Sequence, residues 1–399
     1  MQQCYIDNRN YGIKLLQPSA KDLEHGLELH KNSLVWDAYG FSPNGPVDGA
    51  LADRLVDEKV HPEDFTDAME AYRQTKFLKD DTFRKEYSYL WEYAGVNCIF
   101  QNAGVEGNRP ELMIKRFGNY LYNTDLYPNI VRRAAFPYQV EQAYKDGVPS
   151  LYFTTNGVPL PFPLDSASEA YRYLDVFYHL GARMMHLSYN RHNLLGGGCG
   201  EKQDMGLTDL GRAVIKKMNE IGIIVDVAHS SQQTSYEAAK ASTKPMVASH
   251  TVAGGLSSHF RGKNDQTCKA IADTNGYVGV CMVPRFLRGS GDLVAFIDHL
   301  DYLIKLLGPD HVAVGTDSVA WCGQSTPQTK DYTVNTGVID SIWPQDDYVE
   351  TLDMYKSLCW TNWPLITVGL VMRGYSDEDI QKVIGLNVLR VTKEVLTDI

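Results

Sequence analysis

IGIIVDVAH, residues 221–229, and PMVASH, residues 245–250, decide the fold. Each stretch is a short apolar run that ends in a histidine, and a polar segment with helical spacing separates them. In a parallel α/β barrel the carboxyl ends of successive strands meet on one face, so we expect His229 and His250 to lie close together. Neutral imidazole is a common zinc ligand, and the pair therefore predicts a metal site. A strand-end histidine is also often a hydrogen-bonded core residue, so a metal site and a pair of core histidines are both compatible with the sequence.

Apolar runs of this kind recur along the chain. They occupy residues 33–37, 96–102, 150–156, 182–189, 221–229, 245–250, 277–283 and 311–317. Between most of them lie segments with apolar residues three and four apart, such as 208–219, 234–241, 265–274 and 293–307. Strand and helix alternating eight times predict a (β/α)8 TIM barrel.

The remaining segments are expected to decorate a single barrel domain that spans residues 1–399. Residues 1–32 precede the first strand as an N-terminal extension, and residues 61–86 form an inserted helical segment after it. The glycine-rich run at 194–200 lacks the lysine of a phosphate-binding loop and is expected to be a connector. Capping residues 376–379 open the C-terminal helices.

The amino-acid composition argues against some classes of binding partner. The chain has 44% hydrophobic and 22% charged residues, with a net charge of −11 and no basic run, which argues against nucleic acid and anionic membranes. No apolar stretch is long enough to cross a bilayer, and the first residues do not resemble a secretory signal. Seven scattered cysteines without CxxC pairing favour free thiols. We therefore expect a cytoplasmic protein, although a chain whose export signal has been removed would look similar.

Several motifs are similar to those of the renal, or membrane, dipeptidase family of the amidohydrolase superfamily. GLTDLGRAVIKKMNEIGIIVDVAHSS (206–231) resembles the family's fifth-strand segment, and KPMVASHTVA (244–253) its sixth. HVAVGTD (311–317) resembles the eighth, and WPLITVGLVMRGYSDEDIQKVIGLNVLRV (363–391) the closing helices. The similarity extends from about residue 33 onward.

This resemblance implies a two-zinc hydrolase of dipeptides, in which the metals activate water and polarise the carbonyl. By position, His229 and His250 match the two histidines that hold one zinc. Asp317 matches the acid that handles the proton of the water and the leaving amine. Arg261 matches the arginine that binds the substrate carboxylate, a task suited to a guanidinium fork.

The chain departs from the family pattern on one side of the site. Where the family has Asp-x-His-x-Asp, residues 37–41 read DAYGF, so that Tyr39 and Phe41 replace two ligands of the other zinc. Asn156 stands where the family has a metal-bridging glutamate, and Tyr189 replaces a substrate-contacting histidine. A binuclear zinc centre is therefore not expected.

Two states of the site remain open. His229, His250 and Asp317 form a two-histidine, one-carboxylate set that could hold one Zn²⁺ with open positions, or the histidines are polar pocket residues of a metal-free protein. Tyr39 and Tyr189 are candidate proton-transfer groups, or rigid aromatic walls. Asn156 and Tyr189 are predicted to contact the substrate.

Some nearby residues are assigned minor roles. His186 has the opposite strand parity and is expected to be a packed residue. His259 is interpreted as a solvated loop residue rather than a substrate contact, and Trp321 and Cys322 are candidates to line the pocket.

The sequence supports two classes of function. The first is a dipeptidase-like hydrolase with at most one metal ion, acting on a small peptide or an amino-acid-derived substrate that bears a carboxylate. The alternative is a metal-free member that catalyses an elimination or isomerisation through Tyr39, Tyr189 and Asp317, or a catalytically silent binding protein. The family resemblance also implies a homodimer.

Overall fold

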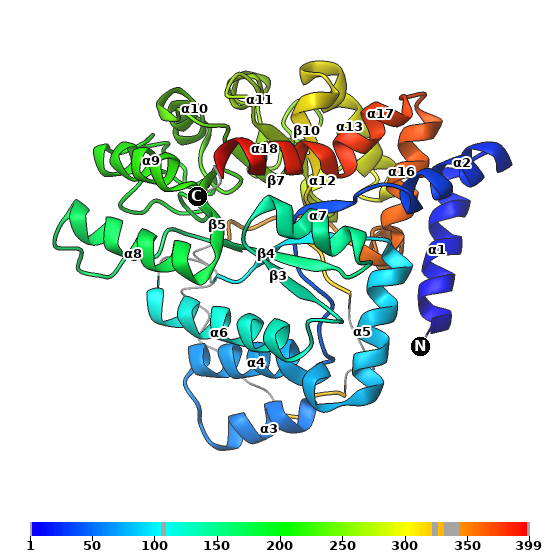
Figure 1. The fold of residues 1–399 in the computed structure, drawn as a ribbon, viewed down its shortest axis with the longest axis horizontal. Coiled ribbons are helices and arrows are strands. Elements are labelled where there is room, and N and C mark those ends of the chain that lie inside the picture. The colour runs from blue at the N-terminus through cyan, green and yellow to red at the C-terminus, as the bar shows by residue number, and fades with distance from the viewer. Residues whose placement is uncertain (1, 105–108, 321–325, 331–342, 397–399) are drawn as a thin grey trace.

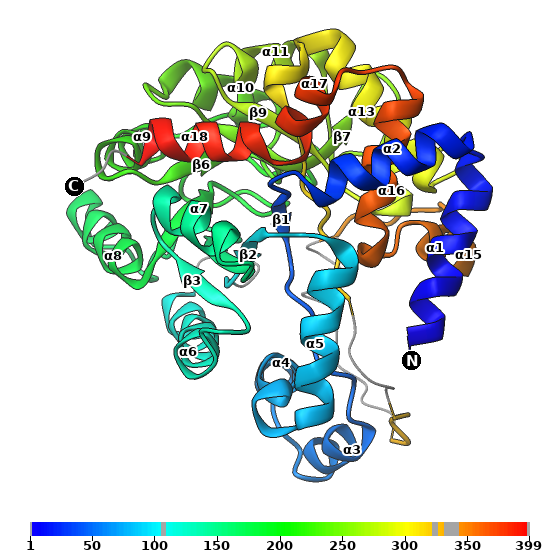
Figure 2. The same ribbon diagram turned by 45° about the vertical axis from the view of Figure 1, so that its right-hand side comes forward.

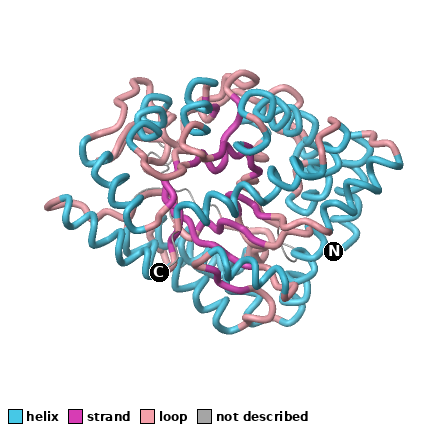
Figure 3. Tube along the Cα trace, turned by 45° about the horizontal axis from the view of Figure 1, so that its top comes forward, coloured by secondary structure: helices cyan, strands magenta, loops and turns pink. Residues whose placement is uncertain are grey.

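The computed structural model describes residues 2–104, 109–320, 326–330 and 343–396. Eight parallel strands neighbour one another in the order β1-β2-β4-β5-β6-β7-β9-β10, with helices packed around them (Figures 1 and 3). Each of these strands overlaps one of the eight predicted apolar runs, although β1 and β7 extend three residues past theirs, and the predicted TIM barrel is confirmed. The strands are β1 (Trp36–Gly40), β2 (Cys98–Asn102), β4 (Ser150–Thr155), β5 (Ala182–His186), β6 (Ile224–Asp226), β7 (Val247–Ala253), β9 (Tyr277–Val280) and β10 (Val312–Val314).

Two further strands are too short to be recognised from sequence periodicity. They are β3 (Arg132–Ala134), which pairs with β4, and β8 (Gly262–Lys263), which pairs with β7. The helices are α1 (Gln2–Leu16), α2 (Ala20–Lys31), α3 (Gly49–Asp57), α4 (Pro62–Lys79), α5 (Asp81–Ala94), α6 (Pro110–Leu126), α7 (Pro137–Lys145), α8 (Ala167–Leu180), α9 (Asp209–Ile221), α10 (Gln232–Ala241), α11 (Asp265–Ala272), α12 (Pro284–Leu287), α13 (Leu293–Leu307), η1 (Pro309–His311), α15 (Leu352–Ser357), η2 (Trp360–Asn362), α16 (Trp363–Met372), α17 (Asp377–Gln381), η3 (Lys382–Leu386) and α18 (Asn387–Val395). None of the described helices is both long and apolar enough to cross a membrane.

The barrel interior is filled from its N-terminal end. Trp36 stacks on Phe100 with ring centroids 5.6 Å apart, and Phe100 meets the edge of Tyr152 at 5.1 Å. Val388 and Val391 of α18 belong to the same buried cluster, so α18 covers this end of the strands. Because the bottom of the barrel is packed with large side chains, polar chemistry is confined to the carboxyl ends of the strands.

The buried carboxylate of Asp37 joins β1 to the end of β10 and to the C-terminal helices. It accepts hydrogen bonds from the backbone nitrogen and the hydroxyl of Thr316, at 2.8 and 2.6 Å, and from the indole nitrogens of Trp360 and Trp363, at 3.2 and 3.4 Å. Burial raises the pKa of Asp37 to about 6, although these hydrogen bonds oppose the rise. A Cβ on Gly40 would lie 2.8 Å from the Asp37 carboxylate, which explains the glycine there.

The inserted segment after β1 is larger than the sequence predicts. The predicted range 61–86 covers α4 and the start of α5, but α3 precedes them, and Figure 2 shows α3 and α4 projecting from the barrel. Residues 2–31 form α1 and α2, and α2 lies so close to α16 that a Cβ on Gly26 would be 2.7 Å from Val368. The extension therefore packs on the C-terminal helices.

Removing the Asp37 carboxylate is expected to destabilise the protein strongly. Asp37→Ala leaves several buried donors without an acceptor, so we expect the free energy of unfolding to fall by about 3 kcal/mol or more. Urea denaturation monitored by tryptophan fluorescence measures the loss. Asp353→Ala is the control, because Asp353 is exposed and its ion pair among the described residues is with Lys356 along α15; it should change stability by less than about 0.5 kcal/mol. Equal stability of the two variants would refute the role of Asp37.

Candidate metal centre

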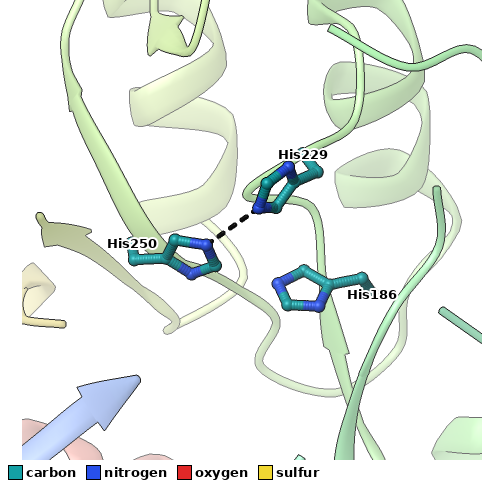
Figure 4. A group of neighbouring side chains, drawn as sticks. All are labelled: His186, His229 and His250. Atoms are coloured by element: carbon teal, nitrogen blue, oxygen red, sulfur yellow. Dashed lines mark hydrogen bonds between the residues drawn. The ribbon is translucent and has the colours of Figure 1, made fainter. Parts of the chain in front are cut away.

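Three buried histidines meet at the carboxyl ends of neighbouring strands. His186 is the last residue of β5, His229 follows β6 by three residues, and His250 lies within β7. One ring nitrogen from each histidine lies within 4.8 Å of the others, and the Nε2 atoms of His229 and His250 are 3.0 Å apart (Figure 4). The predicted proximity of His229 and His250 is thus confirmed.

The other nitrogen of each paired ring is held by a hydrogen bond. His229 Nδ1 donates to Asn190 Oδ1 at 2.8 Å. The single proton of the Ser249 hydroxyl goes to Asp226 Oδ2, so Ser249 Oγ accepts from His250 Nδ1 at 2.8 Å. With both Nδ1 atoms protonated, the two Nε2 atoms present lone pairs to each other, which is the arrangement of imidazoles that share a cation.

His186 joins this cluster, although the sequence analysis expected only a packed residue. Its Nδ1 donates to the carbonyl of Thr155 at 2.7 Å, and its ring centroid is 5.3 Å from those of His229 and His250. Its Nε2 lies 2.9 Å from Asp226 Oδ2 but has no aligned hydrogen bond among the described residues. Strand parity was a poor guide here, because β5 ends at His186 and the chain then turns.

An irregularity in β7 positions His250. The register between β7 and β9 shifts between Ala248 and Thr251, and the Ser249 carbonyl points toward Gly279 and Gly315. A Cβ would lie 1.9 Å from this carbonyl oxygen at Gly279 and 2.1 Å from it at Gly315. Only glycine fits at these two positions. The close packing of β9 and of the end of β10 against Ser249 therefore fixes the backbone position of the next residue, His250.

Two buried cations flank the cluster. Arg261 donates from Nη1 to the Ala228 carbonyl and from Nη2 to the His250 carbonyl at 2.8 Å, and Lys263 Nζ donates to the Ser230 carbonyl. Burial, followed by the Arg261 charge, lowers the pKa of both His229 and His250 well below the ordinary 6.5. The imidazoles are therefore neutral at pH 7, as metal ligands must be. Lys263 went unnoticed in the sequence because nothing in its motif marks it as buried.

Both predicted tyrosines cover the histidines. Tyr39 stacks on His250 with centroids 3.7 Å apart and an interplanar angle of 13°, and its hydroxyl donates to Asn156 Oδ1 at 2.5 Å. Tyr189 stacks on His229 at 4.0 Å and 21°. Tyr39, Tyr189 and Asn156 thus lie at the same site as the histidine pair.

Asp317 is connected to the site through its backbone. It follows β10 with a left-handed φ of 52°, and its backbone nitrogen donates to the Tyr39 carbonyl at 3.0 Å. Its charge also contributes to a raised pKa of the Cys281 thiol, for which burial is the main cause.

His259 is buried, so its interpretation as a solvated residue was wrong. It is 5% exposed, stacks on Phe286 at 4.5 Å, and has Nε2 3.2 Å from Asp346 Oδ2. Trp343 packs over the same region, 5.8 Å from Phe286 and 6.1 Å from His229. Trp321 and Cys322 lie outside the described residues.

A sequence model of the membrane dipeptidase family, peptidase family M19, matches residues 124–331, just over half of the chain. The chain belongs to this family. Dipeptidase tcpJ of Claviceps purpurea (strain 20.1) is 25% identical over 227 residues, which cover 56% of this chain and 47% of that protein. An uncharacterized protein in the pqqA 5′ region of Klebsiella pneumoniae is 35% identical over 158 residues, which cover 37% of this chain and 58% of that protein.

The chain thus spans about half the length of the curated relatives that it matches. Among solved structures, an amidohydrolase from Pseudomonas aeruginosa has the same fold. Its TM-score is 0.68 with 21% identity, over 94% of this chain and 99% of that one. This likeness supports the barrel architecture of the membrane dipeptidase family member.

The close approach of Gly279 to β7 gives a direct test of how this family member builds its centre. Gly279→Ala puts a methyl group onto the Ser249 carbonyl, so we expect a loss of about 1–3 kcal/mol or more, seen as a lower melting temperature. Gly118→Ala in α6 is the control: nothing lies within 4 Å of the new Cβ, and a helical alanine should stabilise by about 0.5–1 kcal/mol. If Gly279→Ala melted like the wild type, the steric argument would fail.

Proposed function

We propose that this protein is a single-metal amide hydrolase that acts on a small peptide or amino-acid-derived substrate bearing a carboxylate. The main support is the pair of Nε2 atoms, 3.0 Å apart, that His229 and His250 turn toward each other. Membership of the membrane dipeptidase family supports the reaction class.

The residues present fit one zinc ion. His229 and His250 would bind it through Nε2, and His186, whose Nε2 lacks an aligned partner among the described residues, would supply the third nitrogen. Three neutral imidazoles are a known ligand set for catalytic zinc. Zinc in such a site supplies Lewis-acid activation of water and of a substrate carbonyl.

A second metal does not fit the opposite side of the site. The residues there are Tyr39, Phe41 and Asn156, and the Asn156 oxygen is already bonded to the Tyr39 hydroxyl. Phe41 packs edge-on against Tyr39 at 6.1 Å and offers no ligand atom. The resemblance-based prediction of at most one metal ion is retained on these grounds.

Four side chains are proposed to bind the substrate, move protons and orient the imidazoles. Arg261 has used one N–H of each terminal nitrogen on backbone carbonyls, and its remaining donors are assigned to a substrate carboxylate. We assign to Asp317 the transfer of a proton from the attacking water to the leaving amine. Tyr39 and Tyr189 hold the imidazole planes and place hydroxyls beside the substrate.

Zinc titration of metal-stripped protein tests the centre. We expect one zinc per chain in the wild type and no stoichiometric uptake in His186→Ala, His229→Ala or His250→Ala. The His229→Ala/His250→Ala double variant should add little, because the ligands act as one unit. His25→Ala is the control, since His25 is half-exposed on α2 and pairs with Asp377.

Other outcomes of the titration are also decisive. Equal, weak uptake by all variants and the wild type would end the metal proposal and leave metal-free chemistry by Tyr39, Tyr189 and Asp317, or binding alone. Two zinc ions per chain would refute the single-metal centre. Normal uptake by His186→Ala alone would remove only the third ligand.

Simple dipeptides are expected to be poor substrates. Because Asn156 stands in place of the family's metal-bridging glutamate, we expect zinc-loaded protein to release amino acids from L,L- or L,D-dipeptides at rates well below about 10 per second. His250→Ala, assayed in parallel, controls for contaminating peptidases. Turnover at ordinary enzyme rates that His250→Ala abolishes would contradict this expectation.

A further inference from the structure

Residues 343–350 form a segment without helix or strand that crosses the carboxyl face of the barrel, and we call it the strap. Near its start, Pro344 lies against the loop that follows β5, because a Cβ on Gly200 would be 3.2 Å from the Pro344 ring. At its end, Glu350 forms an ion pair with Arg285 of α12, which follows β9. Because β6 and β7 lie between β5 and β9 in the sheet, the strap spans the ends of the two strands that position the histidine pair.

Trp343 of the strap lies over the candidate metal centre. Its ring centroid is 6.1 Å from that of His229, at an interplanar angle of 77°, and 6.0 Å from that of Tyr189, which stacks on His229. The Trp343 ring is also stacked with Phe286, at 5.8 Å and 16°. These aromatic rings cover the imidazole, and His229 is only 2% exposed.

The arginine assigned to the substrate carboxylate is closed off as well. Arg261 and His250 are both 0% exposed. The Arg261 guanidinium lies 5.6 Å from the centre of the Phe286 ring, which is the ring that stacks with Trp343. A substrate carboxylate therefore cannot reach Arg261 unless part of this covering moves.

Side chains, rather than a ladder of backbone hydrogen bonds, hold the strap in place. Arg285 donates from Nε and Nη2 to the two carboxylate oxygens of Glu350, at 3.0 and 2.7 Å. Arg288 Nη1 donates to Asp346 Oδ1 at 2.9 Å. Both arginines are partly exposed, and ion pairs at exposed positions each contribute little to stability. These contacts can therefore keep the strap closed and still release it at modest cost.

We propose that the strap opens to admit the substrate to Arg261 and the histidines, and that Trp343 then closes over the bound substrate and excludes water. Closure of a loop over a substrate shields the reacting groups from water and strengthens the electrostatic interactions in the site. The ion pairs that control the opening lie at the other end of the strap from the ring that covers the histidines. This inference rests on the proposed function, because it takes Arg261 and the histidines as the substrate site.

Acylation of His229 by diethyl pyrocarbonate, in metal-free protein, measures the opening of the strap without catalysis. Burial lowers the pKa of His229, so its imidazole is neutral at pH 7, which is the form that the reagent acylates. Tryptic peptide 218–240 contains His229 as its single histidine, so mass spectrometry measures the acylation rate at that residue. We expect Trp343→Ala to raise this rate about tenfold, because it removes the ring that covers His229. Arg285→Gln should raise it about threefold, through loss of the ion pair with Glu350.

Two other histidines and one further variant control the experiment. His192 is exposed and gives the acylation rate of an open histidine, whereas His30, buried on α2, reports global unfolding. Arg212→Gln is the matched control, because Arg212 of α9 pairs with Glu237 of α10 and its side chain is 46% exposed, as is that of Arg285. This variant should acylate His229 at the wild-type rate.

The outcomes separate the strap from the fold and from the metal centre. Faster acylation of His229 with unchanged His30, in Arg285→Gln as in Trp343→Ala, supports the proposal. Unchanged acylation of His229 in either variant, or an equal rise at His30, would overturn it. The Arg285→Gln/Glu350→Gln double variant should react no faster than Arg285→Gln alone, and an additive increase would overturn the role of the ion pair. Because no step requires zinc or turnover, failure of the zinc titration and failure of the strap are distinguishable.

Discussion

The closure of the barrel depends on one buried carboxylate. Asp37 accepts from Thr316 after β10 and from the indoles of Trp360 and Trp363, so two distant parts of the chain converge on β1. Its raised pKa shows that burial of this charge is costly, and the converging donors offset that cost. As a consequence, Tyr39, two residues further on, is fixed against His250.

The candidate metal centre follows from packing constraints of the same kind. The Ser249 carbonyl can approach Gly279 and Gly315 so closely only because neither has a side chain, and the next residue, His250, brings its Nε2 to 3.0 Å from that of His229. Asn190 and Ser249 then fix the two tautomers. The backbone therefore sets the position of the imidazoles, and hydrogen bonds set which nitrogen they present.

The sequence predicted the strands well because apolar runs of five to nine residues have a clear pattern, and each of the eight overlaps a barrel strand. It missed β3 and β8, which are three and two residues long, and it missed α3 in the insertion. The role of His186 depends on where β5 ends, and the burial of His259 depends on its stacking against Phe286. Neither can be derived from periodicity, because both depend on contacts between segments far apart in the chain.

The charged groups around the three histidines bear on which substrate the site suits. Arg261 and Lys263 are buried beside His229 and His250, whose pKa values are lowered, and Asp226 Oδ2 lies 2.9 Å from His186 Nε2. Burial opposes the ionisation of Asp226, yet His186 and Ser249 hold the pKa of Asp226 below its usual value. The carboxylate therefore places one negative charge next to the histidine cluster. A zinc ion held by the histidines would add its positive charge to those of the buried Arg261 and Lys263. Under the proposed function, a substrate carboxylate bound by Arg261 would bring negative charge next to these two buried cations, which favours a substrate that bears a carboxylate.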